Sequence, residues 1–315
     1  MGDRAMSRYL MITLTLGVCA TPWEAQPLFS SSVDLVHLGV TVMDENKQLL
    51  SGLTAEDFVL QEQGREQDIS YFSRGLDSDL EVMPFHLGVL FDASGSMDRD
   101  AGFAKTAAIK FLLSLNFAVD MTLVDFDAQV RVSRFGQTDF PRLVERLRSQ
   151  VTGGMTALYD ALGVYLDGAF TQDGRKVLLL YSDGGDTRSR MRFGELLDLV
   201  RASDVTIYVI GFQTRTRSGA RMMERRRLEE IAALTGGQCY FPSSVDDLDE
   251  IYAQIRDELT GRYSLGYVTT DPTTDGSWRR VTVRLADSRP ELKGARIRTR
   301  EGYFVPYVED ESRDR

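Results

Sequence analysis

The stretch FHLGVLFDASGSM (residues 85–97) decides the fold class of this 315-residue chain, because an apolar run leads directly into a polar loop. Residues 85–91 are apolar at almost every position, without the alternation of a strand that has one face in water. Such runs suit a strand that is buried on both faces of a parallel sheet. Asp92, Ser94 and Ser96 follow at every second position. The sequence therefore predicts a buried strand that delivers three oxygen-bearing side chains to one loop.

The same alternation of apolar runs and helical patterns continues over residues 84–260. Further strand-like runs occupy 121–126, 176–181 and 205–211, and helical patterns occupy 102–115, 157–169, 193–202, 225–234 and 245–259. Strands that alternate with helices predict a doubly wound, mostly parallel, Rossmann-like α/β sheet with helices on both faces. The run at 130–135 follows its predecessor so closely that it predicts a hairpin, and therefore one antiparallel edge strand.

The segments on both sides of this region have a β-type pattern. Short strand-like runs lie at 33–43, 57–62 and 68–73, and again at 263–268, 279–286 and 295–304. Neither flank has enough strands to form a stable domain alone, so we expect the two to pair into one small β-sandwich with the α/β domain inserted between them. The predicted domains are thus 21–83 and 261–308 for the sandwich halves, 84–260 for the α/β domain, and 309–315 for a polar tail.

Two further loops are predicted to meet the loop at Asp92. In doubly wound sheets, ligands bind beyond the carboxyl ends of the strands, where the winding direction reverses. Asp183 follows the strand at 176–181, and Thr156 precedes the helix at 157–169. Two carboxylates and three hydroxyls form an all-oxygen ligand set that suits Mg²⁺, Ca²⁺ or Mn²⁺. We therefore predict a divalent cation, with Mg²⁺ first, held by Asp92, Ser94, Ser96, Thr156 and Asp183.

Each of these side chains also has a purely structural interpretation. Asp92 and Ser94 are suited to capping the next helix, and Thr156 stands where a helix N-cap belongs. The convergence of five such residues on one predicted point favours the metal over capping. Asp186 is expected only to shape its glycine-rich turn.

Taken in order, the five residues resemble the metal-ion-dependent adhesion site of the von Willebrand factor type A domain family, whose pattern is Asp-x-Ser-x-Ser, then Thr, then Asp. The resemblance covers roughly residues 84–260. It implies a site that binds proteins and catalyses nothing, in which three hydroxyls contact the ion and a partner supplies an Asp or Glu carboxylate to a vacant coordination position. The flanks resemble bacterial exported relatives of this domain at residues 52–58 and 302–304.

Two other functions stay open beside this one. The first is a structural or assembly component of an envelope complex, in which the ion only stabilises loops. The second, more remote, is a metal-dependent hydrolase. Other enzyme classes fit poorly, because the two histidines, His37 and His86, lie away from the site, and neither a G-x-S-x-G elbow nor a GxxxxGK[ST] loop occurs.

The charge of the chain argues against nucleic acid as a partner. With 37 Lys and Arg against 47 Asp and Glu, the net charge is −10, whereas phosphate binding needs clustered basic residues. The one basic run, at 215–227, has no interleaved aromatic residues, and we expect it to be a solvated loop. Asp125 and Asp127, which flank a predicted hairpin, are expected to be structural.

The N-terminal residues 1–20 indicate export. Arg4 and Arg8 precede an apolar run at 9–19, and a small-residue pattern follows at 18–20, as in a cleaved signal peptide. Lipidation at Cys19 is the alternative. We expect a periplasmic, cell-surface or secreted protein with no membrane-spanning segment after cleavage. Cys239 would then be the single remaining cysteine, leaving no internal disulfide.

Overall fold

A computed structural model of the chain describes five stretches, residues 35–75, 84–114, 118–212, 219–289 and 292–307. The predicted signal at 1–20 and the predicted tail at 309–315 lie outside the described residues. So do residues 213–218, which include part of the basic run.

A six-stranded sheet forms the centre of the α/β region. Its order is β10-β9-β8-β5-β6-β7, and every neighbouring pair is parallel except β6 and β7. The antiparallel edge strand predicted for 130–135 is therefore confirmed. The strands are β5 (Phe85–Asp92), β6 (Asp120–Phe126), β7 (Val130–Gly136), β8 (Arg175–Ser182), β9 (Thr206–Gly211) and β10 (Cys239–Tyr240).

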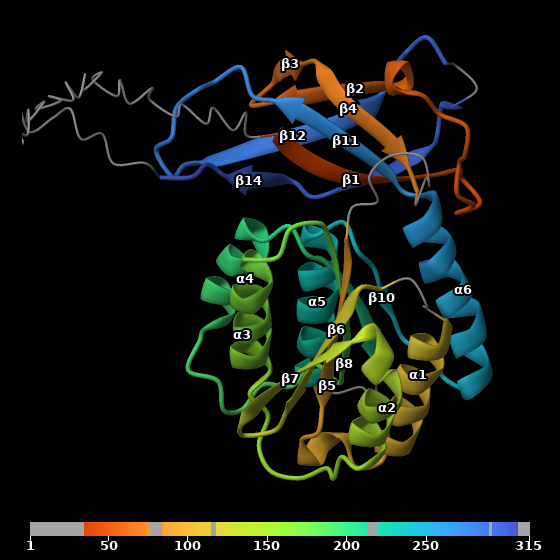
Figure 1. Cartoon of the computed structure of the whole chain (residues 1–315), viewed down its shortest axis with the longest axis vertical. Coiled ribbons are helices and arrows are strands. Elements are labelled where there is room, and N and C mark those ends of the chain that lie inside the picture. Colours follow the sequence, from red (N-terminus) through yellow and green to blue (C-terminus); the bar gives the residue numbers. More distant parts are fainter. Residues whose placement is uncertain (1–34, 76–83, 115–117, 213–218, 290–291, 308–315) are drawn as a thin grey trace, which may run out of the picture. The chain divides into compact units, whose positions relative to one another are not determined.

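Helices cover both faces of this sheet, as the alternating pattern predicts. Figure 1 shows α1, α2 and α6 on one side of the strands and α3, α4 and α5 on the other. Each group closes its own apolar core against the sheet. Their bounds are α1 (Ala101–Ser114), α2 (Phe140–Arg148), α3 (Leu158–Phe170), α4 (Phe193–Ala202), α5 (Gly219–Leu234) and α6 (Val245–Gly261).

Two four-stranded antiparallel sheets are built from the flanking segments. Their orders are β13-β1-β11-β4 and β14-β12-β2-β3, so each sheet mixes strands from before and after the α/β region. Apolar side chains of both sheets share one core, which confirms a sandwich made from both flanks. The strands are β1 (Leu35–Met43), β2 (Phe58–Glu62), β3 (Arg65–Gln67), β4 (Ile69–Arg74), β11 (Tyr263–Val268), β12 (Trp278–Leu285), β13 (Arg296–Arg298) and β14 (Gly302–Phe304).

Two local predictions are wrong, and one helix was missed. The run at 295–304 is two strands in different sheets, because β13 pairs with β1 and β14 pairs with β12. Residues 219–227 of the basic run are the first turns of α5 and no loop, since the helix buries Leu228 and Ile231 on its apolar face. Helix α2, with three buried apolar residues after a proline start, was not predicted.

Gly88 allows helix α3 to pack closely against strand β5. A Cβ atom on Gly88 would lie 2.3 Å from the ring of Tyr165 in α3. The buried tyrosine ring therefore rests directly on the backbone of β5. This contact sets the distance between α3 and the strand that ends at Asp92.

We expect Gly88→Ala to lower the free energy of unfolding by about 1–3 kcal/mol, because the added methyl group forces Tyr165 or the strand to move. Gly102→Ala is the matched control: among the described residues no heavy atom lies within 4 Å of a Cβ there, and alanine favours the helix by up to about 1 kcal/mol. Chemical denaturation measures both. Equal stabilities for the two variants would contradict the packing described.

Candidate metal centre

The sheet order places the ends of two acidic strands side by side. Strand β5 pairs in parallel with β8, so both carboxyl ends lie at one edge of the sheet. Asp92 is the last residue of β5, and Asp183 directly follows β8. The pairing of β5 with β8 therefore brings Asp92 and Asp183 to the same edge of the sheet. The expected adjacency of the two strands is thus confirmed.

Backbone hydrogen bonds join three loops at this edge. The amide of Gly153 donates to the carbonyl of Ala93 at 2.9 Å, and the amide of Gly95 donates to the carbonyl of Gly154 at 3.1 Å. Gly154 has φ +76°, and a Cβ on Gly95 would lie 3.3 Å from the oxygen of Gly154. Glycine is the residue that permits both the positive φ and this close approach.

The third loop is tied to the second through Thr156. Its carbonyl accepts hydrogen bonds from the amides of Thr187 and Arg188, both at 2.9 Å. Its own amide donates to the hydroxyl of Thr187 at 3.0 Å. The loops that follow β5 and β8, together with the loop before α3, therefore form one hydrogen-bonded assembly that carries all five predicted ligands.

Asp92 is fully buried in this assembly. Its carboxylate accepts from the amide of Ser94 at 2.9 Å and from the hydroxyl of Ser182 at 2.6 Å. Among the described residues, its hydrogen-bond partners are neutral and include no lysine or arginine. Burial, which raises the pKa of Asp92, the hydrogen bonds, which lower it, and the charge of Asp183, which raises it, together give a pKa of about 7. The site thus contains a buried carboxyl group whose charged form has no cationic hydrogen-bond partner among the described residues.

Ser182 was not predicted as part of the site. Its hydroxyl donates to Asp92 and accepts from the amide of Gly184 at 3.0 Å. It therefore holds Asp92 in place and shapes the turn that carries Asp183. The available signal was its position, directly before Asp183 at the end of a buried strand.

The two serines of the first loop lie together. The Oγ atoms of Ser94 and Ser96 are 3.0 Å apart, with Ser94 buried and Ser96 exposed. Ser94 precedes a short 3₁₀ helix (Gly95–Met97), but its side chain makes no capping hydrogen bond. Capping therefore does not explain this residue, and the exposed Ser96 opens the pair of hydroxyls to solvent.

Thr156 is also free of the capping role that its position suggested. Helix α3 begins at Leu158, and its N-cap is Ala157, which forms no side-chain cap. The amides of its first turn are satisfied from another loop instead: Asp186 accepts from Tyr159, and Ser189 accepts from Asp160, each at 3.0 Å. Asp186 thus does more than shape its turn, because it holds α3 against the loop of Asp183.

Further acids surround Asp183. Burial and then the charge of Asp183 raise the pKa values of Asp100 and Glu224. Asp100 lies just before α1, and Glu224 lies in α5, whose backbone would be 3.1 Å from a Cβ on Gly184. Neither acid was predicted, because their approach depends on how α1 and α5 pack. Arginines also act on these two acids, Arg221 and Arg99 on Asp100 and Arg221 and Arg227 on Glu224, and lower their pKa values.

The chemistry of these residues fits a hard divalent cation. Their donors are all oxygen atoms, which Mg²⁺, Ca²⁺ and Mn²⁺ prefer. Positive charge at this point would offset the buried charge of Asp92 and the repulsion from Asp183. Within the described stretches, no group of three His, Cys, Asp or Glu side chains is arranged to hold a metal, so a site here depends on the hydroxyls.

Asp125 and Asp127 are engaged elsewhere, in salt bridges. Asp125 is fully buried, pairs with Arg131 in β7, and accepts from Arg146 of α2 at 2.9 Å. Asp127 pairs with Arg131 at 3.1 Å. These contacts attach α2 and the edge strand to the sheet.

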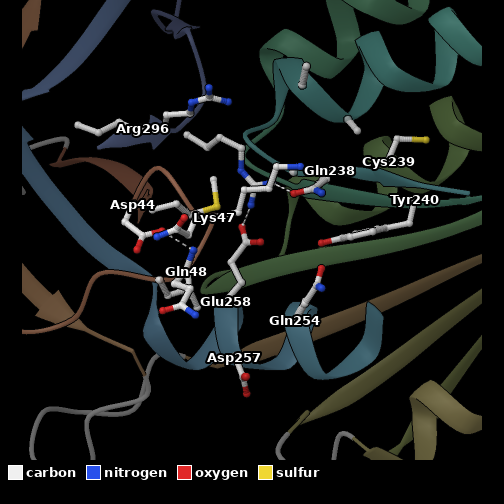
Figure 2. Close-up of a pocket in the computed structure, with 18 of the residues that line it drawn as sticks. Asp44, Lys47, Gln48, Gln238, Cys239, Tyr240, Gln254, Asp257, Glu258 and Arg296 are labelled. Carbon is white, nitrogen blue, oxygen red and sulfur yellow. Dashed lines mark hydrogen bonds and ion pairs between the residues drawn. The ribbon is translucent and has the colours of Figure 1, made fainter. Parts of the chain in front are cut away.

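A separate cavity of about 1220 Å³ lies away from this edge. Figure 2 shows residues of three regions around it: Asp44, Lys47 and Gln48 after β1, Gln238, Cys239 and Tyr240 at β10, and Gln254, Asp257 and Glu258 of α6. Glu258 is buried, accepts from Thr41 at 2.9 Å and pairs with Arg298. Burial raises the pKa of the Cys239 thiol, so this thiol is not a ready nucleophile at neutral pH.

The sequence around this site matches the model of a known domain family. The model of the von Willebrand factor type A domain matches residues 86–254, more than half of the chain. The chain belongs to the von Willebrand factor type A domain family. The matched stretch of the type A domain contains all three loops of the candidate site.

Solved structures with a similar fold include a von Willebrand factor type A protein, a pilus adhesin and a hypothetical protein. A von Willebrand factor type A protein from Catenulispora acidiphila is 15% identical, with a TM-score of 0.47, over 90% of this chain and 76% of that one. The pilus adhesin SpaC of Lactobacillus rhamnosus GG is 10% identical, with a TM-score of 0.48, over 85% of this chain and 48% of that one. The hypothetical protein BatB of Bacteroides thetaiotaomicron is 13% identical, with a TM-score of 0.44, over 55% of this chain and 98% of that one. No match was found among curated proteins.

None of the helices in the described stretches has the length and apolar character needed to cross a bilayer.

The buried charge of Asp92 predicts a pH dependence of stability without metal. The folded pKa of about 7 lies above the ordinary value of 3.8, so the folded state binds more protons than the unfolded state between these values. The contribution of Asp92 to the free energy of unfolding is therefore lost as pH rises from about 4 to 7, by up to about 1.4 kcal/mol per pH unit. In Asp92→Asn this loss is absent.

Chemical denaturation in a chelating buffer, at several pH values from 4.5 to 8, measures this difference. We expect the stability of Asp92→Asn relative to wild type to increase with pH and to level off above about pH 7. A difference that does not change with pH would show that Asp92 is not buried as a lone charge.

Proposed function

We propose that this chain is an exported protein-binding module in which a divalent cation, Mg²⁺ first and Ca²⁺ or Mn²⁺ as alternatives, links it to a partner. The ion would be held by Asp92, Ser94, Ser96, Thr156 and Asp183. The partner would present an Asp or Glu carboxylate. We propose a binding role and no catalytic role for this site.

The convergence of the three loops carries this proposal. Hydrogen bonds between the loops fix the ligands before any ion arrives, so little conformational entropy opposes binding. Neither Ser94 nor Thr156 is occupied as a helix cap. Membership of the type A family adds that such domains generally bind proteins.

The composition of the ligand set explains why a partner carboxylate would be attracted. Three of the five ligands are neutral hydroxyls, so the chain supplies less negative charge than an all-carboxylate site would. The hydroxyls neutralise none of the ion's charge, so a divalent cation bound here could accept a further carboxylate oxygen from a partner. The exposed Ser96 lies on the side from which a partner can approach.

Metal binding is tested by thermal unfolding of the full chain with Mg²⁺, Ca²⁺ or Mn²⁺ against a chelator. We expect a saturable rise in Tm for wild type and a large loss of that rise in Thr156→Ala. Thr152→Ala is the matched control, since Thr152 lies in the same loop outside the ligand set. No saturable rise with any of the three ions would refute the metal.

Metal-dependent binding of a partner is tested by crosslinking and capture from envelope extract, with and without chelator. We expect one or more proteins to be captured by wild type and Thr152→Ala with Mg²⁺, and to be lost with chelator and in Thr156→Ala. Chemical conversion of the extract's carboxylates to amides should abolish capture. If the metal raises the Tm but the chelator does not change capture, the ion would instead have a structural role in an assembly.

A further inference from the structure

A small polar cavity lies at the opposite edge of the sheet from the candidate metal centre. It measures about 80 Å³ and is bounded by the first residues of β8 and β9 and by β1 and β11 of the sandwich. Its lining includes Arg175, Lys176 and Arg262, with Gly39 and Ser264 on the sandwich side. Three basic residues therefore meet at one cavity in a chain whose net charge is −10.

One of these three cations is neutralised and two are not. Lys176 pairs with Asp204 at 2.8 Å. Arg175 donates to the carbonyl oxygens of Gly75 and Leu259, both at 3.0 Å. Within the described stretches no carboxylate forms an ion pair with Arg175 or with Arg262, so no ion pair offsets the charge of either arginine.

Arg262 is the more confined of the two. Only 5% of it is exposed, and it donates to the hydroxyl of Thr206 at 2.7 Å and to the carbonyl of Gly39 at 2.9 Å. Its Nε is buried and has no hydrogen-bond partner. A Cβ on Gly39 would lie 2.4 Å from this Nε, so the absence of a side chain at Gly39 is what makes room for the guanidinium.

A third arginine adds to the charge beside the cavity. Arg300 donates to the carbonyl of His37 at 2.7 Å, again a neutral acceptor, and its own Nε is buried without a partner. Burial and then the charge of Arg262 lower the pKa of Arg175 to about 10. Burial lowers the pKa of Arg300; the charge of Asp204, which also lines the cavity, raises it, and the charge of Arg262 lowers it. The arginines thus repel one another, and Asp204 offsets this repulsion only for Arg300 and Lys176.

We propose that this cavity binds a small oxyanion, such as phosphate or sulfate, through Arg175 and Arg262. Guanidinium groups suit oxyanions because their planar N–H donors match the oxygen geometry. The cavity is far smaller than the roughly 300–1,000 Å³ of pockets for drug-sized ligands, which excludes a nucleotide. The hydroxyl of Ser264 can donate to the same anion. This site is independent of the proposed metal centre.

The anion would act as a link between the two parts that line the cavity. Arg175 begins strand β8 of the α/β sheet, while Gly39 and Ser264 face each other across the β1–β11 pair of the sandwich. A buried anion held from both sides would reduce the repulsion among the arginines and stabilise their junction.

A charge placed in the cavity tests the idea without removing any arginine. Ser264→Asp supplies a permanent carboxylate at the cavity wall, and Ser264→Asn is its neutral match. In anion-poor buffer with chelator, we expect Ser264→Asp to melt at least about 2–4 °C above Ser264→Asn. Titration with inorganic phosphate, sulfate or formate at constant ionic strength should raise the Tm of wild type saturably, and Ser264→Asp should lose that response.

Two results would overturn the proposal. One is a wild-type response to phosphate and sulfate that rises linearly without saturation and is shared by Ser264→Asp, as general exclusion of these salts from protein surfaces predicts. The other is a Tm of Ser264→Asp equal to or below that of Ser264→Asn. A response to formate alone would overturn the preference for tetrahedral oxyanions.

Discussion

The site depends on a carboxylate that is withdrawn from water without a cationic partner. Desolvating a charge is costly unless an opposite charge or several hydrogen bonds compensate it, and the hydrogen bonds that Asp92 accepts among the described residues come from neutral groups of Ser94 and Ser182. The parallel pairing of β5 with β8 brings the second carboxylate, Asp183, close to the first. The fold thus concentrates negative charge at one edge of the sheet, and a divalent cation is the simplest means of compensating it.

Much of this arrangement could be predicted from the sequence, because its signals are local. Apolar runs such as residues 85–91 define buried strands, and the alternation with helices defines the sheet that brings Asp92, Thr156 and Asp183 to one edge. The errors come from long-range pairing. The run at 295–304 divides because its two halves find partners in different sheets. Asp100 and Glu224 approach the site only through the packing of α1 and α5, which no local pattern reports.

Opposite charges gather at opposite edges of the same sheet. The carboxyl edge holds Asp92 and Asp183 with further acids around them, whereas the amino edge holds Arg175 and Arg262 beside the sandwich. The net charge of −10 conceals this separation. Asp92 at one edge and Arg175 and Arg262 at the other form no ion pair within the described residues, and each edge is therefore suited to an ion of the opposite sign.

Anomalous scattering from crystals of the full chain grown with Mn²⁺ tests the central claim most directly. The account predicts one strong anomalous peak coordinated by the hydroxyls of Ser94, Ser96 and Thr156 and adjacent to Asp92 and Asp183, which disappears in crystals of Thr156→Ala. An empty site at saturating Mn²⁺, or a peak held only by other residues, would contradict it.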